Sequence, residues 1–224
     1  MADTSRRQRV ERVLDRTIKP VVWIVALALL GQMAYEMYTG RLVDPIEDLT
    51  HRTGFVALAA LMLTLAVTPV RRATGWNGAV NARRLLGLWA FAFALIHFGI
   101  YLFDQGVLLE GAAAWSYVVE DVAERPYVTV GFTALLLLVP LAVTSTKGWV
   151  RRLGGKRWQR LHRLVYVVAV AGLVHFFLAV KRDVRDPTLY ALVFGTLFAA
   201  RLIVGRARAG RAVASAAPAR AAES

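Results

Sequence analysis

The chain contains four histidines and no cysteine, and this limits the redox chemistry it can support. His97 and His175 stand well inside long apolar runs, whereas His51 and His162 stand where such runs begin. The lack of cysteine excludes disulfides, cysteine-ligated iron–sulfur clusters and covalent haem attachment through a C-x-x-C-H motif. Histidine is therefore the residue type that carries the chemical signal.

His97 and His175 lie at nearly equal depth in their apolar runs. His97 follows Arg84 by 13 residues and His175 follows Arg160 by 15, which places each roughly 20 Å along its helix. Ionisable side chains at such depth are costly in hydrocarbon and usually functional. Two imidazoles at matched depth on separate helices meet the needs of bis-histidine haem ligation. The competing interpretation is a pair of core histidines that hydrogen-bond to neighbours.

The positions of the other two histidines give less support for a functional site. His162 precedes His175 by 13 residues, which on an ideal helix turns the two about 140° apart. A local distortion would be needed for both to face one side, and Gly172 is the expected place for it. His51 follows Thr50, a residue type that caps helices, so it is equally consistent with a residue at a helix start.

Six apolar runs must position these histidines. Each has the roughly 17–25 residues that an α-helix needs to cross about 30 Å of hydrocarbon. The chain is 57% hydrophobic and only 19% charged, which leaves too little polar surface for an ordinary soluble domain of this size. We therefore predict an all-α integral membrane protein, a bundle of six transmembrane helices. The expected spans are 20–38, 54–70, 85–103, 127–144, 161–180 and 187–204.

The net charge of +13 is concentrated in loops. Basic stretches alternate with acidic segments at 40–53 and 104–125. The positive-inside rule then places the basic loops and both termini in the cytoplasm. Lipid headgroups and topology explain these stretches better than a nucleic-acid partner does. The basic stretches are 6–16, 71–84, 147–163 and 201–211.

Three parts follow from this pattern. We expect a cytoplasmic segment at 1–19, a transmembrane domain at 20–204 and a disordered cytoplasmic tail at 205–224, which is rich in alanine and arginine.

Four arginines near the predicted cytoplasmic side are candidate anion ligands. Arg83 and Arg84 begin the third span, and Arg152 and Arg157 precede the fifth. Guanidinium groups pair bidentately with carboxylates and phosphates, so these residues are candidates to bind haem propionates, a flavin phosphate or a quinone site. For any single arginine, anchoring at the cytoplasmic interface is the simpler explanation.

Several longer stretches resemble one known family. They are similar to the signatures of the MsrQ family, also called YedZ, over roughly residues 15–205 with compatible spacing. The stretches are RRLLGLWAF at 83–91 with LIH at 95–97, RPYVTVG at 125–131, TST at 144–146, RLGGKRWQRLH at 152–162 continuing to VHF at 174–176, and DP at 44–45 with His51 and TG at 53–54.

This resemblance implies a multi-pass protein of the bacterial inner membrane, related to ferric reductase-like transmembrane domains. It implies one or two b-type haems, with FMN and quinone as further candidate cofactors. Electrons would come from the quinone pool or a cytoplasmic flavin reductase. They would pass to a periplasmic molybdopterin-containing subunit that repairs oxidised methionines in envelope proteins. The chain would then be an electron-transfer subunit, and the sulfoxide-reducing site would lie on the partner.

The resemblance also assigns the histidines. His97, His175 and His162 match the haem-associated histidines of the family, and His51 matches a recurrent histidine whose role stays open. The wider ferric-reductase pattern has two histidines on each of two helices. Here the inner partner of His162 would fall at Arg83 or Arg84, and arginine is a poor iron ligand.

An outer haem between His97 and His175 is therefore predicted. His162 would serve an inner haem with a different second ligand, or a flavin or quinone site. Two other functions stay open at this point. One is a quinol-oxidising cytochrome b or a ferric reductase with another acceptor. The other is a transporter or scaffold without a cofactor.

Overall fold

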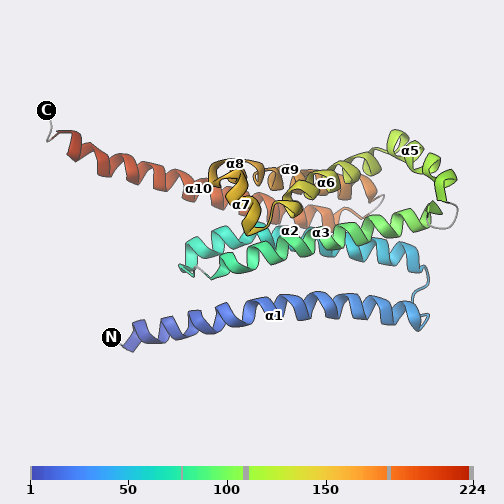
Figure 1. The fold of residues 1–224 in the computed structure, drawn as a ribbon, viewed down its shortest axis with the longest axis horizontal. Coiled ribbons are helices and arrows are strands. Elements are labelled where there is room, and N and C mark those ends of the chain that lie inside the picture. Colours follow the sequence, from blue (N-terminus) through green and yellow to red (C-terminus); the bar gives the residue numbers. More distant parts are fainter. Residues whose placement is uncertain (1, 77, 108–110, 181–182, 222–224) are drawn as a thin grey trace.

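The computed structural model describes residues 2–76, 78–107, 111–180 and 183–221. Helices joined by turns make up these residues, and no strand occurs among them (Figure 1). The helices are α1 (Ala2–Tyr38), α2 (Pro45–Thr74), α3 (Ala79–Asp104), the 3-10 turn η1 (Gly111–Ala114), α5 (Trp115–Glu124), α6 (Pro126–Val143), α7 (Lys147–Leu153), α8 (Gly155–Leu161), α9 (Leu164–Ala179) and α10 (Arg185–Ala221).

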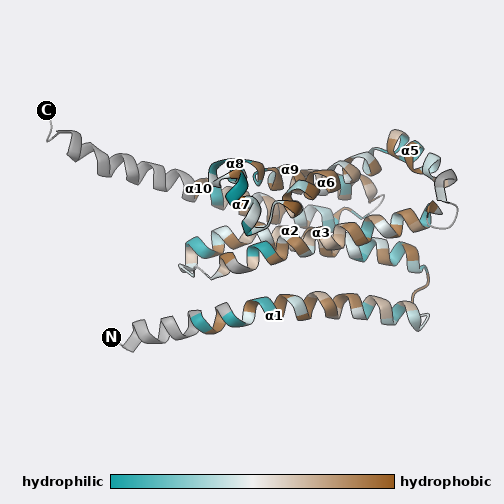
Figure 2. Ribbon diagram, in the orientation of Figure 1, coloured by the Kyte–Doolittle hydropathy of each residue, from teal (hydrophilic) through white to brown (hydrophobic). Residues whose placement is uncertain are grey.

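Five helical segments are long and apolar enough to cross a membrane. They are Pro45–Thr74, Ala82–Asp104, Pro126–Val143, Gly155–Ala179 and Arg185–Ile203. These coincide with five of the predicted spans, and the prediction of an all-helical multi-pass membrane protein is confirmed. Figure 2 shows that apolar residues predominate in the middle of these helices. Many large apolar side chains are exposed, as contact with lipid requires.

The sixth predicted span, 20–38, lies within α1, which is helical but is not among those five segments. The six-span count and the cytoplasmic location of both termini therefore stay predictions. The same holds for the segment 1–19 and the tail 205–224, of which residues 222–224 lie outside the described residues.

The sequence explains where the central helices begin and end. Asp44 caps α2 by accepting a hydrogen bond from the Glu47 backbone at 3.1 Å, and Pro45 occupies the first turn. His51 thus lies inside the helix, and the interpretation of Thr50 as a helix cap is wrong. At the far end, Gly75 has a φ of 74°, the left-handed conformation that closes many helices.

The fifth predicted span is interrupted near its N-terminal end. His162 and Arg163 form a turn between α8 and α9, so the chain is not one straight helix there. α9 then runs without a break through Gly172. The prediction of a distortion at Gly172 is therefore wrong, because the helix is interrupted at His162, ten residues earlier.

Two antiparallel helix pairs form the centre of the bundle. α2 packs along α3, and α6 packs along α9 (Figure 1). Apolar side chains from both pairs form one core. α10 covers α2 and α9. α1 lies along α3, where Trp23 and Trp89 meet edge to face at 5.0 Å, and Arg52 of α2 forms an ion pair with Glu36 of α1.

Candidate functional site

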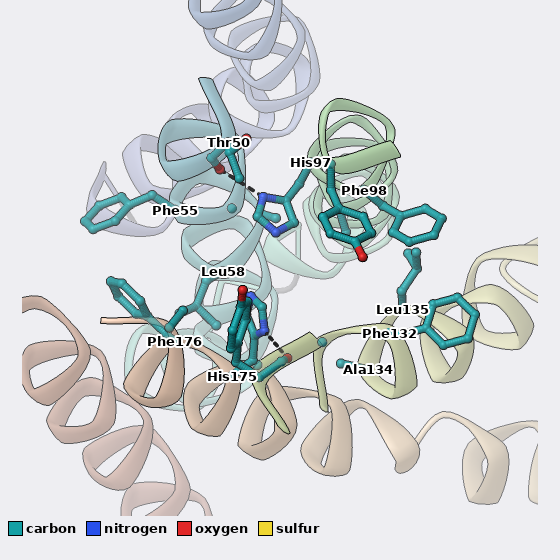
Figure 3. A pocket seen from close by; sticks show the side chains of 18 of the residues that line it. Thr50, Phe55, Leu58, His97, Phe98, Phe132, Ala134, Leu135, His175 and Phe176 are labelled. Atoms are coloured by element: carbon teal, nitrogen blue, oxygen red, sulfur yellow. Dashed lines mark hydrogen bonds between the residues drawn. The ribbon is translucent and has the colours of Figure 1, made fainter. Parts of the chain in front are cut away.

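A cavity of about 370 Å³ lies between the two helix pairs. This volume is in the range of small-molecule and cofactor sites. Apolar side chains such as Leu58, Phe132 and Leu135 dominate its walls. His97 from α3 and His175 from α9 stand on opposite sides of it (Figure 3).

Both histidines donate a hydrogen bond to a backbone carbonyl on a neighbouring helix. Nδ1 of His97 lies 2.9 Å from the Thr50 carbonyl oxygen, and Nδ1 of His175 lies 2.7 Å from that of Tyr127. A carbonyl can only accept, so Nδ1 carries the hydrogen in each ring. The neutral imidazole then has an unprotonated Nε2 with a free lone pair. Metal-bound histidines commonly show this arrangement, in which the second nitrogen donates to a carbonyl.

The spacing of the two rings suits a metal held between them. Their centroids are 5.9 Å apart, and their planes cross at 85°. Metal–imidazole bonds of about 2 Å, with each centroid about 1 Å beyond its nitrogen, require a centroid separation of roughly 6 Å. The rings point toward each other across the cavity in Figure 3. Hydrogen-bonded core histidines would explain the carbonyl contacts but not the facing free nitrogens.

The kind of metal group follows from the number of ligands. Within the described ranges, no group of three or more His, Cys, Asp or Glu residues could hold a bare metal ion. Two facing imidazoles in an apolar cavity instead suit a metal whose other ligands come from a porphyrin. His97 and His175 therefore have the chemistry and the spacing to hold one haem.

Comparison with known proteins agrees with this geometry. Residues 53–173, which include His97 and His162 and end two residues before His175, match the family described as ferric reductase like transmembrane component. The chain is 45% identical over 195 residues to the protein-methionine-sulfoxide reductase heme-binding subunit MsrQ of Herminiimonas arsenicoxydans, covering 84% of this chain and 83% of that protein. It is 42% identical over 215 residues to MsrQ of Rhodospirillum rubrum, covering 95% and 96%.

This chain belongs to the MsrQ family. A third relative, MsrQ of Xanthomonas euvesicatoria pv. vesicatoria, is 40% identical over 194 residues, covering 85% of this chain and 86% of that protein. The resemblance inferred from the sequence motifs is thus confirmed across most of the chain.

His162 has different surroundings from His97 and His175. Its Nε2 lies 3.0 Å from the Thr144 hydroxyl, and that hydroxyl also lies 2.6 Å from the Pro140 carbonyl. The single hydroxyl hydrogen goes to the carbonyl, which can only accept, so Thr144 accepts from Nε2–H of His162. The ring stacks on Trp158 at 4.0 Å, and the indole of Trp158 donates to the Thr144 carbonyl at 2.9 Å. His162 does not line the cavity between His97 and His175.

His51 lies at the margin of the site. Its side chain is 60% exposed, and Nε2 lies 3.7 Å from a carboxylate oxygen of Glu47, one turn earlier on α2. It borders the histidine cavity and also a second, more open pocket that includes Asp183 and Asp186.

The four candidate arginines are separate from the cavity, since none of them lines it. Arg83 is partly buried at the start of α3, whereas Arg84 is exposed. Arg152 and Arg157 are exposed too, and the guanidinium of Arg152 lies over the Trp149 ring at 5.5 Å.

Polar contacts lie at the rim of the cavity near Tyr101. Tyr101, which lines it, donates a hydrogen bond to Asp121 of α5 at 3.0 Å, and Asp121 pairs with Arg125 at 3.0 Å. The hydrogen bond from Arg125 to the Tyr127 hydroxyl, together with the Asp121 carboxylate, raises the pKa of Arg125. This network joins α3 to the loop before α6.

Four residues of the site have roles that the sequence did not reveal. Thr50 and Tyr127 act through backbone carbonyls, which any residue type supplies. Gly54 and Gly131 lie directly against the two rings. Both glycines fall near the start of an apolar run and within stretches that resemble the MsrQ family, and these were the signals available in the sequence.

Proposed function

We propose that this MsrQ-family chain carries electrons across the bacterial inner membrane, through b-type haem, to a periplasmic molybdopterin-containing methionine sulfoxide reductase. The observation that carries the proposal is the pair His97 and His175, with rings 5.9 Å apart and Nε2 free on each. The relatives are named as heme-binding subunits of protein-methionine-sulfoxide reductase, which supports both the cofactor and the partner.

The residues of the cavity have two tasks in this function. His97 and His175 would hold the haem, while Leu58, Leu135 and Phe176 would exclude water from it. When bound, haem would supply one-electron redox chemistry, at a potential that its histidine ligands, its burial and the hydrogen bonds around it would tune. Each Nδ1–H bond to a carbonyl makes its imidazole a stronger electron donor.

The sulfoxide itself is reduced elsewhere in this proposal. Methionine sulfoxide takes two electrons and two protons to give methionine and water. The chain has no cysteine to act as a thiol reductant. It would therefore deliver electrons singly to a partner that completes the reaction.

A second redox group near His162 would shorten the electron path. One outer haem leaves about half of the ~30 Å hydrocarbon core to cross. We place an inner haem, FMN or a quinone at that end, with the quinone pool or a cytoplasmic flavin reductase as donor. His162 would contact it through Nδ1, since Nε2 donates to Thr144. Arg83, Arg84, Arg152 and Arg157 are the candidates for its anionic groups, and six spans with cytoplasmic termini complete the arrangement.

A second candidate function is a ferric reductase or quinol-oxidising cytochrome b with another acceptor. The match of residues 53–173 to the ferric reductase like family favours it. The two functions share the haem and differ in the acceptor. Co-purification with a periplasmic molybdoprotein, followed by electron transfer to methionine sulfoxide, would favour the first. Efficient reduction of ferric chelates without such a partner would favour the second.

Cofactor content is the experiment that tests the proposal. The protein would be produced with haem supplied, and the purified subunit assayed by pyridine haemochrome and by flavin release. We expect b-type haem at one or two per chain. A colourless preparation would contradict electron transfer and would favour a transporter or scaffold.

A further inference from the structure

Gly54 of α2 and Gly131 of α6 each lie against the ring of a cavity histidine. A Cβ atom at Gly131 would lie 2.6 Å from Nδ1 and 2.8 Å from Cε1 of His175. A Cβ atom at Gly54 would lie 3.1 Å from both Nδ1 and Cε1 of His97. The first contact is too short for any side chain, and the second requires the ring to shift slightly. Only glycine leaves both rings where they are.

The two glycines belong to the same local arrangement. Gly54 follows Thr50 by four residues, and Gly131 follows Tyr127 by four. Residues four apart lie on the same face of a helix, one turn from each other. Each histidine ring thus rests on the glycine while its Nδ1 reaches the carbonyl one turn earlier. A helical carbonyl retains a second lone pair for this extra bond.

We call each combination a glycine–carbonyl cradle: Thr50 with Gly54, and Tyr127 with Gly131. A hydrogen bond in the plane of the ring fixes its direction, and contact with the glycine blocks its rotation. The walls of the cavity are otherwise mainly apolar. The rotation of each ring is therefore set by the neighbouring helix rather than by the helix that carries the histidine.

We propose that the two glycine–carbonyl cradles hold the imidazole planes crossed and thereby set the electronic structure and the potential of the haem. This proposal rests on the proposed haem function. The planes cross at 85° in the structure. Crossed axial imidazoles leave two iron d orbitals nearly equal in energy, which gives ferric haem a strongly anisotropic low-spin EPR signal with one dominant low-field line. Parallel planes separate those orbitals and give a rhombic signal with three resolved lines.

Alanine substitutions test the cradles, and Gly99→Ala is the matched control. Gly99 lies on α3 two residues after His97, and a Cβ atom there meets nothing within 4 Å. We expect Gly131→Ala to shift the EPR signal toward the rhombic form. We also expect it to raise the midpoint potential, because a weaker Nδ1–H bond lowers the basicity of the ligand. Gly54→Ala should act in the same direction with a smaller shift, and Gly99→Ala should match the wild type.

Wild-type line shape and potential in both Gly131→Ala and Gly54→Ala would overturn the proposal. If Gly131→Ala retains no haem, the milder Gly54→Ala decides the question alone. A colourless wild-type protein would instead refute the haem function itself. The two failures are therefore distinguishable.

Ligand rescue tests the carbonyl half of the cradle. In His175→Gly, added imidazole and 1-methylimidazole can both bind iron, but only imidazole has an N–H to donate to the Tyr127 carbonyl. We expect imidazole to restore the crossed-plane signal at a lower concentration, and 1-methylimidazole to restore a low-spin haem with an altered signal. Equal rescue by both, with the same signal, would show that the carbonyl contributes nothing.

Discussion

The histidines predicted to lie on the outer side, His97 and His175, and the one predicted to lie on the inner side, His162, hydrogen-bond through opposite nitrogens. His97 and His175 donate from Nδ1 to helix carbonyls, which leaves Nε2 free on facing edges of a cavity. His162 donates from Nε2 to the Thr144 hydroxyl, whose own hydrogen goes to the Pro140 carbonyl. All three residues lie in apolar spans or at their start. Only His97 and His175 leave Nε2, the ring nitrogen farther from the backbone, free to bind a ligand.

The difference shows that the hydrogen-bond partner decides what a membrane histidine can bind. In the proposed function, the carbonyls at Nδ1 would orient the rings of His97 and His175 for iron before haem binds. At the inner end, stacking on Trp158 covers one face of the His162 ring. An inner cofactor must therefore use Nδ1 of His162, or Thr144 must release Nε2.

Removing an outer histidine should have the largest effect. We expect His97→Ala and His175→Ala each to abolish most low-spin haem absorbance, because bis-imidazole ligation needs both rings. His51→Ala, which alters an exposed side chain at the cavity margin, is the control and should keep a spectrum close to wild type. Optical spectra of the purified variants measure this, and unchanged spectra in both outer variants would refute the ligand assignment.

Removing His162 should reduce haem binding less than removing His97 or His175. We expect His162→Ala to lower total haem by half at most and to leave the outer low-spin signal unchanged, because His162 does not line the outer cavity. Pyridine haemochrome and EPR on the same sample measure both quantities. Loss of the outer signal would show that the two ends are not independent.

Thr144→Val tests the hydrogen bond that holds His162. Valine keeps the shape of threonine but loses a buried hydroxyl that makes two hydrogen bonds. We expect a loss of about 1–3 kcal/mol in the free energy of unfolding, since an unsatisfied partner remains. The outer haem spectrum should not change. Unfolding in detergent measures the change in free energy. An altered spectrum of the outer haem would contradict the expectation that the His162 end and the His97–His175 cavity are independent.

The smallest effect is expected at the outer rim. Tyr101→Phe removes one hydrogen bond to Asp121, which keeps its ion pair with Arg125. We expect the free energy of unfolding to fall by about 1 kcal/mol. Haem content should stay at the wild-type level, because the phenyl ring still lines the cavity. A large loss of haem would mean that Tyr101 contributes more than packing.

The positions of the helices and of the outer pair could be predicted from the sequence. Apolar length locates the spans, and the fixed rise per residue places His97 and His175 at one depth. The structure places the centroids of their rings 5.9 Å apart. Both inferences use only regular helix geometry.

The remaining features depend on tertiary contacts. At the interruption of the helix, His162 stacks on Trp158 and hydrogen-bonds to Thr144. α9 continues without interruption through Gly172. The roles of Gly54 and Gly131 were not predictable, because a glycine in an apolar run carries no mark of which ring will lie on it. Backbone acceptors leave no trace in the sequence at all.

The axial ligation of haem in the purified wild-type protein tests the central claim most directly. Near-infrared magnetic circular dichroism of the ferric protein identifies the two axial ligands from their charge-transfer band. We predict a bis-imidazole band, and its loss in His175→Ala. A haem whose band shows any other ligand pair, or a protein that binds no haem, would contradict the assignment of His97 and His175.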